Sequence, residues 1–379
     1  MRLQLKNTPE QVELIRAMGS KDPAVAREAS EAFAAFLGPV VQKVIYQAAT
    51  ASGVYTDAPY DEDDSPSYPL DLYYNEGKGF VTVWSQALPG GLPSSHVEGM
   101  SELKIATYRL DSAVSFNKRY ARKARLDVVS KAVERMAQEV LVKQERNAWA
   151  VIMKGLAEAS TDVDGTAYQH VVREDSQSNF NIGALNDLMT RMKRINASFA
   201  GGTPSDAYSQ GVTDLYVSPE VKANIRSFAY NAVGGADNNA GRTHTDLPDN
   251  VRDSIYRSAG SQEIFGVNIT ELNELGVGQK YNTLFDTFAG STAYKKHDNT
   301  GGQQFDGTAD QILVGIDNSK GALVRPVARN ADTGATFTAI PDEQFAINRM
   351  DKQGFYGSLE EGRVLVDARA IAGIFLDAS

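Results

Sequence analysis

The sequence predicts an α+β protein in which helices and strands are mixed without regular alternation. One observation is a helical pattern of exceptional length between Leu126 and about Ala159. A second is that β-branched and aromatic runs, typical of strands, lie on both sides of this helix without the strict strand–helix alternation of a doubly wound sheet. No internal repeat at the periods of solenoid proteins is present. The chain of 379 residues is long enough for two or more layers or domains.

The long helix, at about 127–158, is the element around which we expect the fold to be organised. Asp127 is its predicted N-cap, because a carboxylate accepts the free N–H groups of a first helical turn. Apolar residues follow at the spacing of one helix face: Val129, Val133, Met136, Val140, Leu141, Ala148, Val151, Ile152 and Leu156. At about 1.5 Å per residue it spans roughly 45–50 Å, so it needs a broad surface to lie against.

The N-terminal residues 1–53 are predicted to form an arm of two helices. The first begins at Thr8-Pro9 and closes at Gly19. The second runs from Asp22-Pro23 to Leu37 and ends before Gly38-Pro39. Because their apolar stripes are thin, we expect the arm to dock on something other than itself.

A long hairpin is predicted next, from strand patterns at Gly79–Gln86 and Leu103–Phe116. A two-stranded ribbon is marginal in water, so it needs a partner in this chain or in another copy. We expect Trp84, Leu88 and Leu92 to contact that partner.

Two charged groups of opposite sign flank this region. The acidic run Asp61, Glu62, Asp63 and Asp64 is interpreted as a solvated loop, with a cation site as the alternative. A basic cluster lies between the hairpin and the long helix, at Lys118, Arg119, Arg122, Lys123 and Arg125. A nucleic-acid patch is one interpretation. The formal net charge of -10 favours the other, in which the basic cluster pairs with the acidic run of another copy.

The second half of the chain contains several further predicted elements. Helices are expected at 182–199 and directly after the strand 214–219, and a long loop is expected at 231–262. Apolar strand patterns follow at Glu263–Leu272, Thr283–Gly290, Gln311–Asp317 and Arg363–Leu376.

The sequence contains no catalytic motif. Phosphate-binding, dinucleotide-binding, zinc-protease and serine-hydrolase patterns are absent, as are cysteines. The four histidines, His96, His170, His244 and His297, lie far apart in the sequence and are interpreted as surface or structural residues. We therefore expect no catalytic residues, no cofactor and no metal. No apolar run is long enough to cross a membrane, and the N-terminus lacks the apolar stretch of a secretory signal.

The order of these elements resembles the major capsid proteins of tailed bacteriophages, which have the Hong Kong 97 type fold. Five segments carry the resemblance: Ala113–Phe116 leading into the long helix, Asp214–Pro219 with the helix after it, Ile264–Ile269, Ile312–Asp317, and Phe345–Arg349 followed by Val364–Ala370.

The resemblance implies a division into four parts. Residues 1–53 would be the N-terminal arm and 54–110 the extended loop (E-loop). Residues 111–180 and 335–379 would form the peripheral (P) domain with the spine helix, and 181–334 the axial (A) domain. Because the arm begins near Met1, we expect no large proteolytic cleavage and a separate scaffold protein.

The resemblance also implies the function. The chain would self-assemble as hexamers and pentamers into the icosahedral capsid of a virion, built in the host bacterial cytoplasm. Its partners would be copies of itself, portal and scaffold proteins and a decoration protein. Double-stranded DNA would be enclosed without sequence-specific binding, and no membrane would be involved. An encapsulin-like shell around a protein cargo is the alternative. Two further alternatives are an enzyme of unknown class and a nucleic-acid-binding module.

Overall fold

The computed structural model describes part of the chain, and its described residues form two compact units. The described residues are 8–61, 66–69, 102–123, 126–163, 166–175, 179–197, 211–228, 249–258, 263–330, 334–341 and 352–378. The first unit is built from 1–68, 103–148 and 324–364. The second is built mainly from 149–323 and 365–379. The limits expected for the P and A domains remain predictions.

Two helices open the first unit as predicted. Helix α1 (Pro9–Met18) has Thr8 as its N-cap, whose side chain accepts a 3.4 Å hydrogen bond from the backbone N–H of Gln11. Gly19 follows as the C-cap. This helix therefore starts and stops at the residues whose chemistry the sequence singles out.

Helix α2 (Pro23–Ala48) is longer than predicted, because it continues through Gly38-Pro39 instead of ending there. Leu37 and Val41 lie one helical turn apart and are both buried in the same core. Burial of a continuous apolar face outweighs the local cost of the glycine and the proline.

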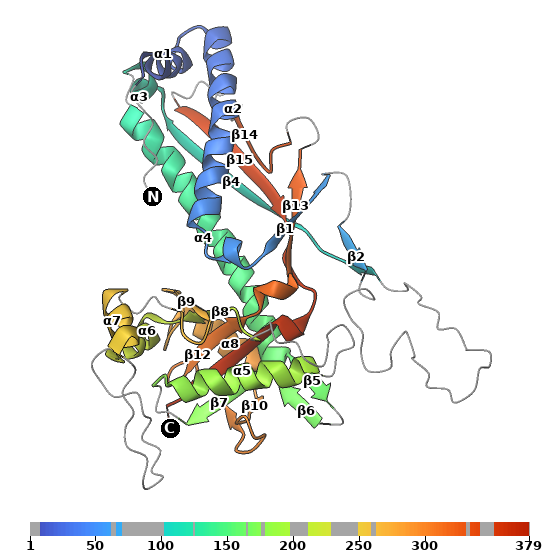
Figure 1. Ribbon diagram of the computed structural model, residues 1–379. Helices are drawn as coiled ribbons and strands as arrows, with labels where there is room; N and C mark the ends of the chain where they lie inside the picture. The colour runs from blue at the N-terminus through green and yellow to red at the C-terminus, as the bar shows by residue number, and fades with distance from the viewer. Residues whose placement is uncertain are drawn as a thin grey trace, which may run out of the picture. The chain divides into compact units, whose positions relative to one another are not determined.

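A mixed sheet forms the other layer of the first unit (Figure 1). Its strands are β1 (Thr56–Asp61), β4 (Tyr108–Asn117), β13 (Leu323–Arg329), β14 (Phe337–Pro341), β15 (Lys352–Glu361) and β16 (Val364–Leu365). Strand β15 pairs antiparallel with β4 along its full length, from Tyr108 opposite Glu361 to Asn117 opposite Lys352. It also pairs antiparallel with β14, while β1 runs parallel to β13.

Two strands of this sheet lie within the range expected for the E-loop, whose limits stay a prediction. Residues 56–61 form β1, which pairs with β13. Residues 108–117 form β4, which pairs with β15, and the expected pairing of 103–116 with 79–86 stays a prediction. The predicted strand at 79–86 lies outside the described residues. A strand pattern identifies a strand without identifying its partner, which can be far away in sequence.

The N-terminal arm docks on something other than itself, as expected, and that surface belongs to its own unit. The first core joins α1 and α2 to α4 and the sheet, and includes Ile15, Phe33, Val133 and Phe355. The rings of Phe33 and Phe355 are 5.2 Å apart. Burial of apolar surface, at about 25 cal/mol per Å², stabilises this contact.

The long helix is confirmed as α4 (Leu126–Glu158), a single helix of 33 residues. It begins one residue earlier than predicted, so Asp127 is a helical residue and not the N-cap. Val129, Val133 and Met136 are buried in the core of the first unit. The preceding turn is α3 (Lys118–Arg122).

A five-stranded sheet lies at the centre of the second unit, in the order β7-β17-β12-β8-β9. Its strands are β7 (Val171–Asp175), β8 (Asp214–Val217), β9 (Asn268–Glu271), β12 (Gln311–Ile316) and β17 (Ile371–Asp377). Every residue of β12 and β17 is buried, so these two central strands are covered on both faces.

Helices cover this sheet. They are α5 (Ile182–Ala197), α6 (Pro219–Ser227), α7 (Asp249–Arg257) and α8 (Lys280–Ala289). Helix α6 begins as the sequence predicts, with Ser218 accepting a 3.2 Å hydrogen bond from the N–H of Val221 and proline at the first helical position. Short two-stranded ladders complete the fold: β2 (Ser67–Pro69) with β3 (Glu102–Lys104), β5 (Ser160–Val163) with β6 (Thr166–Gln169), and β10 (Ala293–Tyr294) with β11 (Gln303–Gln304).

Two sequence interpretations in this unit are wrong, and a third is confirmed only in part. The predicted strand 283–290 lies in α8, in which Tyr281, Phe285 and Ala289 are buried at helical spacing. The predicted loop 231–262 contains α7. The strand predicted at 263–272 is confirmed over β9, but it begins with a turn, because Phe265 and Gly266 have φ values of 53° and 79°.

No helix among the described residues is long and apolar enough to span a bilayer.

Candidate functional site

Both ends of segment 62–106 are attached to one carboxylate in the first unit. Tyr60, which precedes the segment, donates a 3.1 Å hydrogen bond from its hydroxyl to Oε1 of Glu360. Thr107, which follows the segment, donates a 2.8 Å hydrogen bond to the same oxygen. Just beyond, the backbone N–H of Ile105 donates to the carbonyl oxygen of Pro66 at 3.1 Å. The chain therefore leaves the first unit and returns to it at neighbouring positions. We call these three contacts, Tyr60 and Thr107 with Glu360 and Ile105 with Pro66, the loop root.

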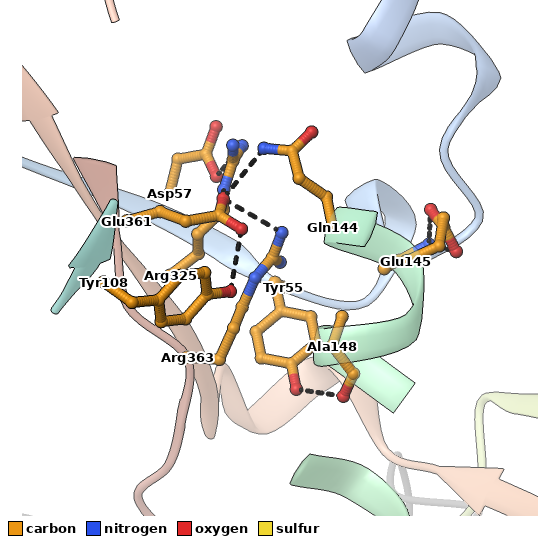
Figure 2. A network of polar contacts seen from close by, with 10 residues as sticks. Tyr55, Asp57, Tyr108, Gln144, Glu145, Ala148, Arg325, Glu361 and Arg363 are labelled. Atoms are coloured by element: carbon orange, nitrogen blue, oxygen red, sulfur yellow. Dashed lines mark hydrogen bonds and ion pairs between the residues drawn. The ribbon is translucent and has the colours of Figure 1, made fainter. Parts of the chain in front are cut away.

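Glu361, the next residue, is the centre of a buried polar network beside the loop root (Figure 2). Its side chain is 0% exposed and accepts from the Tyr108 hydroxyl at 2.9 Å and from Arg325 Nε at 2.7 Å. Gln144 Nε2 on α4 donates at 3.0 Å and Arg363 Nη2 at 3.3 Å. A buried carboxylate is tolerated when it is paired and hydrogen-bonded in this way. Glu361 thus joins β4, β13 and α4.

Tyr108 and Arg325 have shifted pKa values in this network. Burial, with Glu361 as the next cause, raises the pKa of Tyr108 to about 12, so its hydroxyl remains a donor. Burial lowers the pKa of Arg325, but the carboxylates of Glu361 and Asp57 outweigh this effect and raise it overall. The network holds β4, β13 and α4 together.

A second set of contacts fixes the chain after α2 to the side of α4. Glu145 accepts from the Thr50 hydroxyl at 2.7 Å and from the backbone N–H of Ala51 at 3.1 Å. The buried Tyr55 hydroxyl donates to the carbonyl oxygen of Ala148 at 2.9 Å, as Figure 2 shows. The chain after α2 and the Glu361 network are therefore both fastened to the same stretch of α4.

The basic cluster lies on and beside α3. Asn117 caps this turn by accepting from the N–H of Arg119 at 2.9 Å. Lys118 is half-buried, while Arg119, Arg122 and Lys123 are exposed. Arg122 also has an internal role that the sequence did not predict, because its Nε donates to the carbonyl oxygen of Gly19 at 2.9 Å and so holds the end of α1.

The other residues predicted to contact a second copy are mostly outside the described part of the chain. Asp61 is exposed at the end of β1. The residues outside the described ranges are Glu62, Asp63, Asp64, Trp84, Leu88 and Leu92, together with Arg125. Pairing between the acidic run and the basic cluster stays a prediction.

The histidines were interpreted as surface or structural residues, and His170 is a structural one. It is fully buried, its Nδ1 lies 3.0 Å from the carbonyl oxygen of Ile371, and its Nε2 lies 2.8 Å from the Thr161 hydroxyl. Burial lowers the pKa of His170, which favours the neutral ring. His96 and His244 lie outside the described residues.

One group in the second unit was missed by the sequence reasoning. Glu174, Asp187 and His297 have ligand atoms within 4.8 Å of one another, and His297 Nδ1 is 3.2 Å from Asp187. Burial first, and Asp187 second, raise the pKa of Glu174 to about 7. The three residues are far apart in sequence and have no motif spacing, so no sequence signal identifies the group. It has the donor types of a cation site, but no second feature points to a ligand.

Comparison with known proteins gave matches among solved structures only. No protein-family model matches the chain, and no curated protein matches it. The capsid of cyanophage P-SCSP1u has 12% identity and a TM-score of 0.46, over 86% of this chain and 87% of that chain. The capsid of the empty GTA particle has 12% identity and a TM-score of 0.47, over 86% of this chain and 90% of that chain.

An encapsulin is among the matches as well. The holo-SrpI encapsulin complex from Synechococcus elongatus has 12% identity and a TM-score of 0.42, over 86% of this chain and 87% of that chain. These matches name the same classes of protein as the sequence resemblance.

Proposed function

We propose that the chain is the major capsid protein of a tailed phage, with a Hong Kong 97 type fold. In this proposal it assembles as hexamers and pentamers into an icosahedral shell around double-stranded DNA. The chain's own elements support it: two N-terminal helices, a segment with joined ends and one helix of 33 residues follow one another in that order, and the chain folds into two compact units.

The observation that carries the proposal is the loop root. Tyr60 and Thr107 bind the same oxygen of Glu360, so a long stretch of chain departs from one point of the sheet and returns to it. That stretch contains apolar side chains, among them Trp84, Leu88 and Leu92. If it is a two-stranded ribbon, it reaches roughly 50 Å at about 3.3 Å per residue. In a shell, those side chains are covered by the next subunit.

In this proposal the arm belongs to its own subunit and does not clasp a neighbour. Because α1 and α2 are buried against their own unit, the arm is a fixed part of each subunit and not a free clasp. The loop, repeated around closed symmetry, then supplies the contact that links subunits. The acidic net charge of -10 limits adhesion of packaged DNA to the wall.

A charged contact between copies accompanies the loop. We assign it to Asp61, Glu62, Asp63 and Asp64 of one copy and to Lys118, Arg119, Arg122 and Lys123 of the next. A charge-swap experiment tests this contact, with Arg119→Glu and Asp63→Lys made separately and together. Each single variant is expected to assemble poorly, and the double variant is expected to recover. No recovery in the double variant contradicts the pairing.

Negative-stain electron microscopy of the purified full chain tests the proposed function directly. Uniform closed shells are the expected result, and a monodisperse monomer under all assembly conditions contradicts it. Deletion of Leu88–His96 is the sharper variant, because it shortens the loop without touching the loop root. We expect the deleted chain to fold but to lose shells. Shells of unchanged stability would show that the loop is not the clasp.

The contents of shells made in the native cell separate a phage capsid from an encapsulin-like compartment. Nuclease-protected double-stranded DNA of uniform length supports the capsid. A single co-purified protein cargo without DNA supports the compartment.

A further inference from the structure

The outer face of α1 is an open surface of mixed apolar and charged character. On the inner face, Ile15 and Met18 are buried in the core of the first unit. Along the outer face runs a shallow hollow with a volume of about 770 Å³. It is lined by Pro9, Val12, Glu13, Arg16, Ala17 and Ser20 of α1 and the turn after it, and by Val25 at the start of α2. Val25 is 43% exposed, so apolar surface is left uncovered beside the charges.

The exposed charges of this face are divided by sign along the helix. Glu10 and Glu13 lie in its N-terminal half, while Arg16 lies in the last turn and Lys21 follows it. Their side chains form no hydrogen bond or ion pair within the described part of the chain. Negative charge near the start of a helix and positive charge near its end stabilise the helix itself. The same division makes the face complementary to a copy of itself that is turned end over end.

An antiparallel pair of α1 helices, related by a two-fold axis, matches the two halves of this face. In such a contact residue i of one copy meets residue j of the other, and j meets i. Glu13 and Arg16 are three residues apart and therefore lie on the same side of the helix. With the axis between them, Glu13 of each copy lies opposite Arg16 of the other, and Val12 lies opposite Ala17. A parallel pair in register would instead set like charges opposite each other.

We propose that the outer face of α1 is a two-fold contact surface whose partner is the same face of a second copy of this chain. Helix α1 enters the contact as a fixed part of its own unit. At about 1.5 Å per residue it is only about 15 Å long, so it offers less than the roughly 800 Å² per partner of a standard interface. The pair is therefore weak alone, and it is strengthened where other contacts hold the copies together.

Carbodiimide cross-linking of the purified full chain tests this contact, because the reagent joins a carboxylate to an amine that touches it. Arg16→Lys keeps the positive charge and supplies the amine. Chains carrying this change are prepared with light and with heavy nitrogen and mixed, so that mass spectrometry separates links between copies from links within one chain. We expect links between copies from Glu13 to position 16. Arg27→Lys is the matched control, because its partner Glu31 lies on the same helix and should link within one chain only.

Charge reversal separates the two-fold contact from the effect of charge on a single helix. Glu13→Arg and Arg16→Glu each place like charges opposite one another in the pair. We expect each to weaken self-association of the unassembled chain several-fold in sedimentation equilibrium. The double variant restores both ion pairs with exchanged signs and is expected to recover, although it suits the macrodipole of α1 worse than either single variant. Recovery within one chain requires that the partner carry the same two positions, so it identifies a second copy.

The proposal is overturned if no link joins Glu13 to position 16 between copies, or if the double variant associates as weakly as the single variants. Links from Glu13 to Lys6 of the same chain would assign this face to the segment before α1, and would overturn the proposal equally. Neither measurement needs a shell. A chain that forms no shells but gives the link between copies fails as a capsid protein and keeps this contact, and shells without the link give the reverse result.

Discussion

Tyr60 and Thr107 donate hydrogen bonds to one and the same atom, Oε1 of Glu360, at 3.1 and 2.8 Å. The two residues stand on opposite sides of a long segment that begins at 62 and ends at 106. A single acceptor on β15 therefore fixes both the departure and the return of the chain. This arrangement makes the loop root a local structure that can be weakened without disturbing either core.

Glu360→Ala is expected to open the loop root. It removes two hydrogen bonds, each worth about 1 kcal/mol, so the segment between them should separate from the sheet more often. Limited trypsin digestion measures how often the segment separates, because Lys78 and Lys104 both lie within it. We expect cleavage there to be several-fold faster. Glu28→Ala, an exposed glutamate on α2, is the control, and equal rates in the two variants would contradict the role of Glu360.

Much of this fold could be predicted from local chemistry, where one residue decides the outcome. Thr8-Pro9 and Ser218-Pro219 begin helices because a side-chain acceptor precedes a residue whose φ is already helical. Gln311–Ile316 is recognisable as a strand because an apolar run of this length suits a strand covered on both faces.

The errors occur where a distant contact decides the structure. The helix α2 continues past Pro39 because Val41 enters a core that residues more than 300 positions later help to build, including Phe355. Thr283–Ala289 has β-branched and aromatic residues typical of a strand, yet burial at every fourth position makes it a helix. The partners of Glu360 and Glu361 are equally invisible, because no spacing rule relates Tyr60, Thr107 or Gln144 to these carboxylates.

Glu361→Ala is expected to destabilise the first unit by about 3–5 kcal/mol. The change leaves Arg363 buried without its counter-charge and deprives Gln144 and Tyr108 of their acceptor. Hydrogen-exchange mass spectrometry of β4 and β15 reports the opening of this unit directly. Glu31→Ala breaks the exposed ion pair with Arg27 instead, and should cost no more than about 1 kcal/mol. Similar protection in both variants would show that the Glu361 network is dispensable.

Gly19→Ala is expected to detach the end of α1 from α3. A Cβ atom at this position would lie 2.6 Å from the backbone nitrogen of Arg122, so the two backbones must move apart. Overpacking of this kind costs about 1–3 kcal/mol, and the hydrogen bond from Arg122 is strained as well. Gly53→Ala is the matched control, because no atom lies within 4 Å of its added Cβ. The prediction fails if hydrogen exchange in α1 is the same in both variants.

The acid–histidine group of the second unit gives the chain a distinct dependence on pH. The pKa of Glu174 is raised to about 7 in the folded protein, from an ordinary value of about 4.5. Burial is the first cause, and the carboxylates of Asp187 and Asp175 reinforce it, while Lys296 acts in the opposite direction. His297, which pairs with Asp187, also faces the group. A folded pKa above the unfolded one stabilises the protein at low pH, and this contribution is lost as pH rises from about 4.5 through 7.

Glu174→Gln removes that titration and should therefore stabilise the second unit at high pH. We expect the variant to be more stable than the native chain at pH 8, with the difference shrinking towards zero near pH 4.5. Trp149, which is buried 4.8 Å from the Tyr216 ring, reports unfolding of this unit by fluorescence in a Trp84→Phe background. Glu158→Gln, an exposed glutamate at the end of α4, controls for the loss of one charge. A difference between Glu174→Gln and the native chain that stays constant across this pH range would contradict the raised pKa, because a group that titrates normally gives no such divergence above pH 5.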